Sequence, residues 1–230
     1  MRFPRASVIV TVTVLALLLP SLQFAQDADR SVAGGGITAP GWQGRIDAAA
    51  AQKGMKLADS KFEKQGSGFL ITTGPAGSYW NPTNMAKGDY TVKATFKEAK
   101  QTYNHPHPYG VFIGGSNLDS DQFDQLYCVA YRDGTFLVRQ FGDGTVSTLI
   151  KRQPNEAVNK AAGPEAPVTQ EVAWTVKGGR AECSINGKVV AGFNKDEIVG
   201  AGKLESTDGI AGIRVTHNSD IEVASFSVGN

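Results

Sequence analysis

Short runs with alternating apolar and polar residues recur along this chain and constrain its fold more than any other feature. In the stretch 88–98, "GDYTVKATFKE", the residues Tyr90, Val92, Ala94 and Phe96 share one face, and polar residues occupy the other. A period of two residues indicates a strand with one buried face, as in an antiparallel sheet. The apolar runs elsewhere in the chain have a similar length and are separated by turn residues.

Four dipeptides mark the tightest of these turns. Asp133-Gly134 and Asp143-Gly144 separate three apolar runs, and Gly178-Gly179 and Asn186-Gly187 separate three more. Such pairs supply the positive φ angles of two-residue hairpins, so each set predicts a three-stranded meander. We count about a dozen strands and one helical turn, in 194–203. The chain is therefore predicted to be all-β, with two antiparallel sheets packed as a sandwich.

The alternation also predicts which side chains fill the space between the sheets. Inward positions of the predicted strands carry large aliphatic and aromatic residues. The expected core includes Tyr90, Val92, Phe96, Val111, Ile113, Val138, Trp174, Ile185, Ile213 and Val215.

The N-terminal residues have the pattern of a targeting segment. Arg2 and Arg5 precede an apolar run, Val8 to Leu19, that is too short to span a membrane and ends at Pro20. We expect residues 1–25 to be a signal peptide cleaved near Ala25, 26–41 to be a flexible lead, and 42–230 to be one domain. The mature protein is then secreted or periplasmic, without membrane insertion.

The charge balance argues against a nucleic-acid partner. The whole chain has 23 basic side chains, which fall to 21 without Arg2 and Arg5, against 22 acidic ones. A nucleic-acid-binding domain carries a basic excess or stripe, and this chain shows neither. A protein partner is left open.

Two cysteines, Cys128 and Cys183, lie in alternating apolar stretches. In an exported protein they either form a disulfide or act as two small core residues. Spacing in the sequence does not decide between these alternatives.

The strand and turn signatures together resemble a known fold family. "GDYTVKATF", "YGVFIGG", "DGTFLVRQF", "CSINGKVV" and "GIAGIRVTH" resemble concanavalin A-like jelly rolls, the group of laminin-G and laminarinase sandwiches. Within that group the chain looks most like exported bacterial domains similar to 3-keto-disaccharide hydrolases. The resemblance covers Trp42 to Val228 and implies a carbohydrate-related function.

His105 and His107 stand in the stretch "YNHPHPYG", just before a predicted strand. Prolines 106 and 108 favour an extended backbone, on which the two rings project to the same side. The pair is a structural loop, a ligand contact or part of a metal site, and a metal would need a third ligand. His217, the only other histidine, lies in a predicted turn that the sequence does not place nearby.

The stretch "GGSNLDSDQFDQ" carries Asp119, Asp121 and Asp124 after a predicted strand. Carboxylates in such a turn suit calcium, which takes six to eight oxygen ligands. The alternative is an ordinary solvated turn, because the glycine and glutamate of an EF-hand loop are missing.

Aromatic residues next to amides suggest a sugar contact. Trp80 and Asn81 precede Pro82 in a predicted Asn-Pro turn, and Tyr109 follows the histidines. Sugars stack on aromatic rings and bond to amides, so we assign Trp80, Asn81, His105, His107 and Tyr109 to ligand binding. The alternative for Trp80 is a place in the core.

Three classes of function fit these observations. The first is an exported domain that recognises a glycan or oligosaccharide without catalysis. The second is cleavage of glycosides of the 3-keto type, which needs a single acid/base and no glutamate pair. The third is a structural or adhesive envelope protein. Laminarinase-like hydrolysis is disfavoured, because no Glu-x-Asp-x-Glu or Glu-x-Asp-x-x-Glu motif is present.

Overall fold

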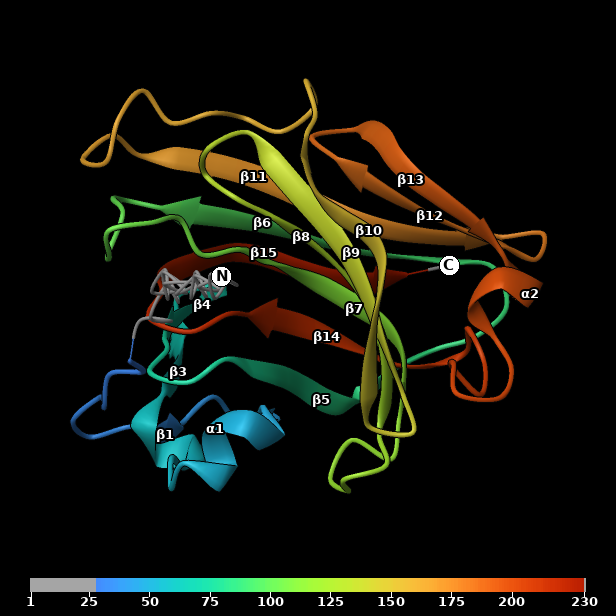
Figure 1. Ribbon diagram of the computed structural model, residues 1–230, viewed down its shortest axis with the longest axis horizontal. Helices are drawn as coiled ribbons and strands as arrows, with labels where there is room; N and C mark the ends of the chain where they lie inside the picture. Colours follow the sequence, from blue (N-terminus) through green and yellow to red (C-terminus); the bar gives the residue numbers. More distant parts are fainter. Residues whose placement is uncertain (1–27, 230) are drawn as a thin grey trace, which may run out of the picture.

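The computed structural model describes residues 28–229, and these form two stacked sheets (Figure 1). The signal peptide expected in 1–25 lies outside the described residues. Eight strands make one sheet, in the spatial order β1 (Gly36–Ile37), β3 (Lys61–Gln65), β4 (Gly68–Thr72), β15 (Asp220–Gly229), β6 (Tyr90–Glu98), β11 (Val168–Lys177), β12 (Arg180–Ile185) and β13 (Lys188–Asn194).

Seven strands make the other sheet, which carries the candidate site. Their order is β10 (Thr145–Pro154), β9 (Thr135–Gly142), β8 (Asp124–Ala130), β7 (Tyr109–Ser116), β14 (Gly209–Val215), β5 (Gly77–Ala86) and β2 (Gln43–Ile46). The prediction of an all-β sandwich is confirmed, with fifteen strands in the described residues instead of about a dozen. Most of the additional strands are short ones before Tyr90.

Helices are few and short. They are α1 (Ala48–Gln52), a 3-10 turn at Leu57–Asp59, and α2 (Lys195–Ile198), the helical turn expected in 194–203. Figure 1 shows α1 and α2 at opposite ends of the sandwich. No helix in residues 28–229 has the length and apolar character needed to cross a membrane.

Both predicted meanders are present as antiparallel sets, β8–β9–β10 and β11–β12–β13. Three of the four predicted turns have positive φ at both residues, among them Asn186 (50°) and Gly187 (79°). Asp133-Gly134 differs, because only Gly134 has positive φ (90°). There the Asp133 carboxylate stabilises the turn instead, by accepting hydrogen bonds from the backbone and side chain of Thr135.

The main core lies between the sheets and contains all ten residues expected there. A second apolar cluster lies on the outer face of the seven-stranded sheet. Its members alternate with core residues along the strands: Tyr127 and Val129 flank the core residue Cys128 on β8. Since successive side chains of a strand point to opposite faces, this cluster faces away from the eight-stranded sheet.

The described part of the expected lead is hydrogen-bonded to the sandwich. β1 pairs with β3 in parallel, and Arg30 donates from its backbone to Asn218 and from its side chain to the Thr73 carbonyl. These bonds place residues 28–41 against the eight-stranded sheet and the turn before β15.

Candidate functional site

A groove of about 340 Å³ lies on the outer face of the seven-stranded sheet. Tyr127, Val129 and Tyr131 supply its floor from β8 and the residue just after it. Leu137 and Arg139 of β9 stand opposite Val129 and Tyr127 in the strand register. The alternation that sends Cys128 and Ala130 into the core thus sends two tyrosines into the groove.

Arg214 of β14 is buried beneath this groove and forms an ion pair with Asp47. Its two terminal nitrogens donate to the two carboxylate oxygens of Asp47 at 2.7 and 2.6 Å. Burial alone would lower the pKa of Arg214, but the Asp47 carboxylate outweighs burial and raises that pKa above its ordinary value. The guanidinium therefore stays charged, 5.3 Å from the centre of the Tyr127 ring.

A second arginine forms one wall of the groove. The Arg152 guanidinium lies 3.9 Å from the centre of the Tyr131 ring and pairs with Asp133 at 2.5 Å. Partial burial favours a higher pKa for Asp133, but the hydrogen bonds from Thr135 and the charge of Arg152 hold it below the ordinary value. The β8–β9 turn thereby fixes a cation over an aromatic ring.

Three histidines close one end of the groove. His105 and His107 come from the loop between β6 and β7, and His217 comes from the turn between β14 and β15. The Nε2 atoms of His105 and His107 are 2.9 Å apart, and the ring centres of His107 and His217 are 4.3 Å apart. One possible ligand atom from each ring lies within 4.8 Å of the other two.

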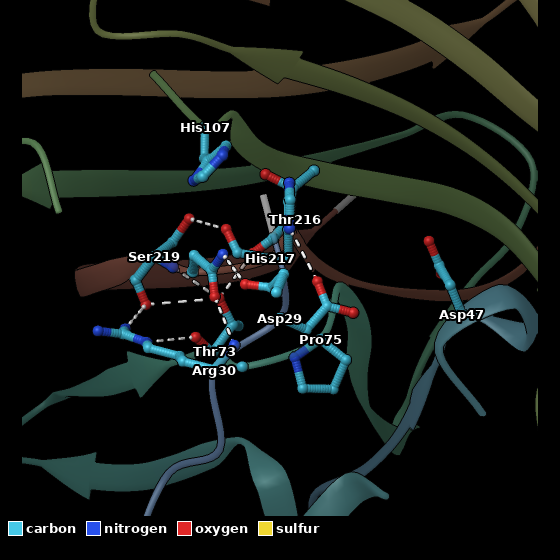
Figure 2. A network of polar contacts seen from close by, with 12 residues as sticks. Asp29, Arg30, Asp47, Thr73, Pro75, His107, Thr216, His217 and Ser219 are labelled. Atoms are coloured by element: carbon cyan, nitrogen blue, oxygen red, sulfur yellow. Dashed lines mark hydrogen bonds and ion pairs between the residues drawn. The ribbon is translucent and has the colours of Figure 1, made fainter. Parts of the chain in front are cut away.

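Polar partners orient two of these rings. His105 Nδ1 lies 2.8 Å from Asn104 Oδ1, and His217 Nδ1 lies 2.8 Å from Asp29 Oδ1. Figure 2 shows Asp29 against His217, with the His107 ring next to them. Within the described residues, these histidines are the only group of three or more His, Cys, Asp or Glu whose ligand atoms come together in this way.

The other predicted ligand residues lie elsewhere. Tyr109 is fully buried in the core between the sheets, and burial raises its pKa well above the ordinary value. Trp80 is 3% exposed and belongs to the outer apolar cluster, where it borders two other hollows together with Leu118 and Asp119. Of the five predicted ligand residues, only His105 and His107 line the groove over β8 and β9.

Asn81 is half-buried, and its Oδ1 accepts hydrogen bonds from the backbone and hydroxyl of Thr83. The prediction of an Asn-Pro turn at this point is wrong. Asn81 and Pro82 lie within β5, where the pairing of β5 with β14 shifts register between Trp80 and Met85. A proline has no N–H to donate, and an irregularity in the ladder accommodates it.

The acidic turn between β7 and β8 does not gather its three carboxylates. Asp119 and Asp121 are exposed, whereas Asp124 is 1% exposed. Asp124 accepts hydrogen bonds from the backbone N–H groups of Asp143 and Glu205 and from the Ser116 hydroxyl. This carboxylate thus joins three chain segments, and calcium binding at the turn stays a prediction.

Sequence reasoning missed most of the groove, namely Asp47, Tyr127, Tyr131, Arg139, Arg152 and Arg214. It named His217 but did not place it near the other two histidines. A signal for the tyrosines was present. In "QLYCVAYR" the two tyrosines alternate with Cys128 and Ala130, so a strand that buries the cysteine must expose the tyrosine face to the other side. The arginines come from three different strands, and only the pairing of those strands brings them together.

No protein-family model matches the sequence, and no curated protein matches it. Solved structures do match. The carbohydrate-binding module CBM66 from Bacillus subtilis superposes with a TM-score of 0.53 at 11% identity, over 85% of this chain and 99% of that chain. A Bacillus subtilis protein of unknown function with a galectin-like fold gives a TM-score of 0.54 at 11% identity, over 82% and 88%.

The carbohydrate recognition domain of Emp46p, in its metal-free form, gives a TM-score of 0.52 at 13% identity, over 82% of this chain and 88% of that chain. These likenesses show the fold. The chain is a β-sandwich of the concanavalin A-like jelly-roll type, as its strand signatures predicted.

Proposed function

We propose that this protein is an exported, non-catalytic domain that binds a glycan in the groove on the outer face of the seven-stranded sheet. The observation that carries the proposal is the groove itself, in which tyrosine rings, guanidinium groups and imidazoles converge. Sugars offer apolar C–H faces for aromatic rings and hydroxyl groups for charged donors. Two of the structures with this fold, CBM66 and the Emp46p domain, are described as carbohydrate-binding.

The test is glycan binding by two matched arginine variants. Arg139 is exposed in the groove, whereas Arg180 is exposed on β12 of the other sheet. After an array has identified a ligand, Arg139→Ala should weaken its affinity at least about tenfold, because a hydrogen bond from a charged group contributes about 1.5–3 kcal/mol. Arg180→Ala should bind as the parent does. Equal affinities for parent and both variants would place the ligand elsewhere.

Export is supported by the N-terminal pattern of two arginines and a short apolar run. The disulfide between Cys128 and Cys183 also fits an oxidising compartment. N-terminal sequencing of protein recovered outside the cytoplasm should start close to Gln26, and an intact Met1 there would contradict cleavage.

A second candidate is cleavage of 3-keto-glycosides, which the three converging histidines favour. This chemistry needs an acid/base next to the oxidised sugar ring, and an imidazole in a groove is such a group. Turnover of a 3-keto-glycoside by the parent, lost in the double variant His105→Ala/His107→Ala, would replace the binding proposal. Glycan binding without turnover would support it.

A further inference from the structure

We propose that His105, His107 and His217 bind one divalent transition-metal ion of the zinc class at the end of the groove. The chain contains only three histidines, and all three meet at this place from two segments that are far apart in the sequence. This inference does not depend on glycan binding, because the metal site is defined by the protein's own side chains.

The spacing of the ring nitrogens suits a single small ion. Zinc binds histidine nitrogens at about 2.0–2.1 Å in tetrahedral geometry, which separates neighbouring nitrogens by about 3.3 Å. The observed separation of 2.9 Å between His105 and His107 and the upper limit of 4.8 Å for the group lie on either side of that value.

The partners of the other ring nitrogens also match a metal site. A neutral imidazole that donates its Nδ1–H keeps the lone pair on Nε2 for the metal. Asp29 accepts such a bond from His217, and Asn104 does so from His105. Metal-binding histidines almost always have such partners, which fix the tautomer and the orientation of the ring.

The two histidine-bearing segments are tied together close to the rings. Thr216 donates from both its backbone and its hydroxyl to the Pro108 carbonyl, at 3.1 and 2.9 Å. Arg30 anchors the segment that carries Asp29 by donating to the Thr73 and Ser219 carbonyls (Figure 2). Hydrogen bonds thus hold both histidine segments and the Asp29 segment before any ion binds, which lowers the entropy lost on binding.

Three nitrogen ligands determine the class of ion and its use. Imidazoles suit zinc, cobalt, nickel and copper, whereas calcium and magnesium prefer oxygen. A tetrahedral ion with three protein ligands keeps one position for water or another ligand. His105, His107 and His217 line the same groove as Tyr131 and Arg214, so a molecule in the groove can reach that position.

The experiment is a calorimetric titration of the metal-free protein with Zn²⁺, on protein made without a histidine tag. We expect one equivalent to bind and the melting temperature to rise, since an ion that binds only the folded state stabilises it. Ca²⁺ should do neither at this site. A folded parent that binds no zinc would overturn the proposal.

Three variants locate the ion. His105→Ala removes an exposed ligand, so the variant should fold normally. Its zinc affinity should fall at least about 100-fold. Loss of a residue that only hydrogen-bonds to a ligand typically costs about 10–100-fold, so loss of the ligand itself should cost more. Asn104→Ala should lose about tenfold, through the orientation of His105. Lys100→Gln, exposed at the start of the same loop, is the control and should keep the parent affinity. Zinc affinity unchanged in His105→Ala would overturn the assignment.

Glycan binding is measured separately on the zinc-free and zinc-loaded parent, so the two proposals fail independently. Zinc bound without any glycan ligand leaves the metal site standing and removes the binding function. If the protein binds a glycan but takes up no zinc, the binding function stands and the metal site is overturned.

Discussion

At the scale of single residues, Arg214 places a buried positive charge beneath the groove. The side chain of Arg214 is 4% exposed and that of its partner Asp47 is 30% exposed, so the arginine of this ion pair is buried and the aspartate keeps some contact with water. Breaking a buried pair costs more than the pair contributes, because the remaining charge loses its partner.

We therefore expect Arg214→Leu to lower the free energy of unfolding by about 3 kcal/mol, the lower end for a broken buried pair because Asp47 keeps some contact with water. Arg214→Lys should lose less, since it restores the charge but not the two parallel hydrogen bonds. Urea unfolding gives these values. The control is Arg180→Leu, whose pair with Glu182 is exposed and should contribute less than about 1 kcal/mol. Equal losses in the two leucine variants would mean that burial of Arg214 adds nothing.

At the scale of elements, the β8–β9 turn links folding to the shape of the groove. Asp133 accepts two hydrogen bonds from Thr135 and pairs with Arg152, which covers the Tyr131 ring. The pKa of Asp133 in the folded protein lies below its ordinary value. The ionised carboxylate therefore stabilises the fold fully at any pH above the ordinary pKa, and this stabilisation is lost as the pH falls through the lowered pKa.

Asp133→Asn should therefore lower the free energy of unfolding at pH 7, and this loss should shrink as the pH falls through the lowered pKa of Asp133, where the parent carboxyl becomes uncharged like the asparagine amide. The loss at pH 7 should stay below about 1 kcal/mol, because both members of the pair are partly exposed to water. Urea unfolding of parent and variant at a series of pH values from 7 into the acid range measures it, with the exposed Glu156→Gln as control. A difference that is independent of pH would show that the hydrogen bonds, and not the charge, matter.

The hairpins were predictable from the sequence because their signals are local. Asn186-Gly187 and Asp143-Gly144 adopt the positive φ angles that such dipeptides favour. The meeting of His107 with His217 was not predictable, because it depends on β14 pairing with β7 so that Val215 stands opposite Tyr109. That register joins strands far apart in the chain, and no turn chemistry specifies it.

At the scale of the whole molecule, alternation was sufficient to predict the sandwich and its core. It did not show which inward side chains touch across the two sheets. Cys128 of β8 and Cys183 of β12 were both expected to face inward, and the packing of the two sheets brings their Cα atoms to 6.4 Å, where the side chains form a disulfide. The bridge joins the seven-stranded sheet to the eight-stranded sheet within the core.

The disulfide should stabilise the sandwich mainly by restricting the unfolded chain. Closing a loop of 55 residues corresponds to about 4 kcal/mol in the chain-entropy estimate. We expect the double variant Cys128→Ala/Cys183→Ala to fold but to unfold at a lower denaturant concentration, with a loss of about 2–4 kcal/mol. Reductant should lower the stability of the parent toward that of the double variant and leave the variant unchanged. Two free thiols in the intact mass of oxidised protein, or equal stability of parent and variant, would show that the sheets are held together by packing alone.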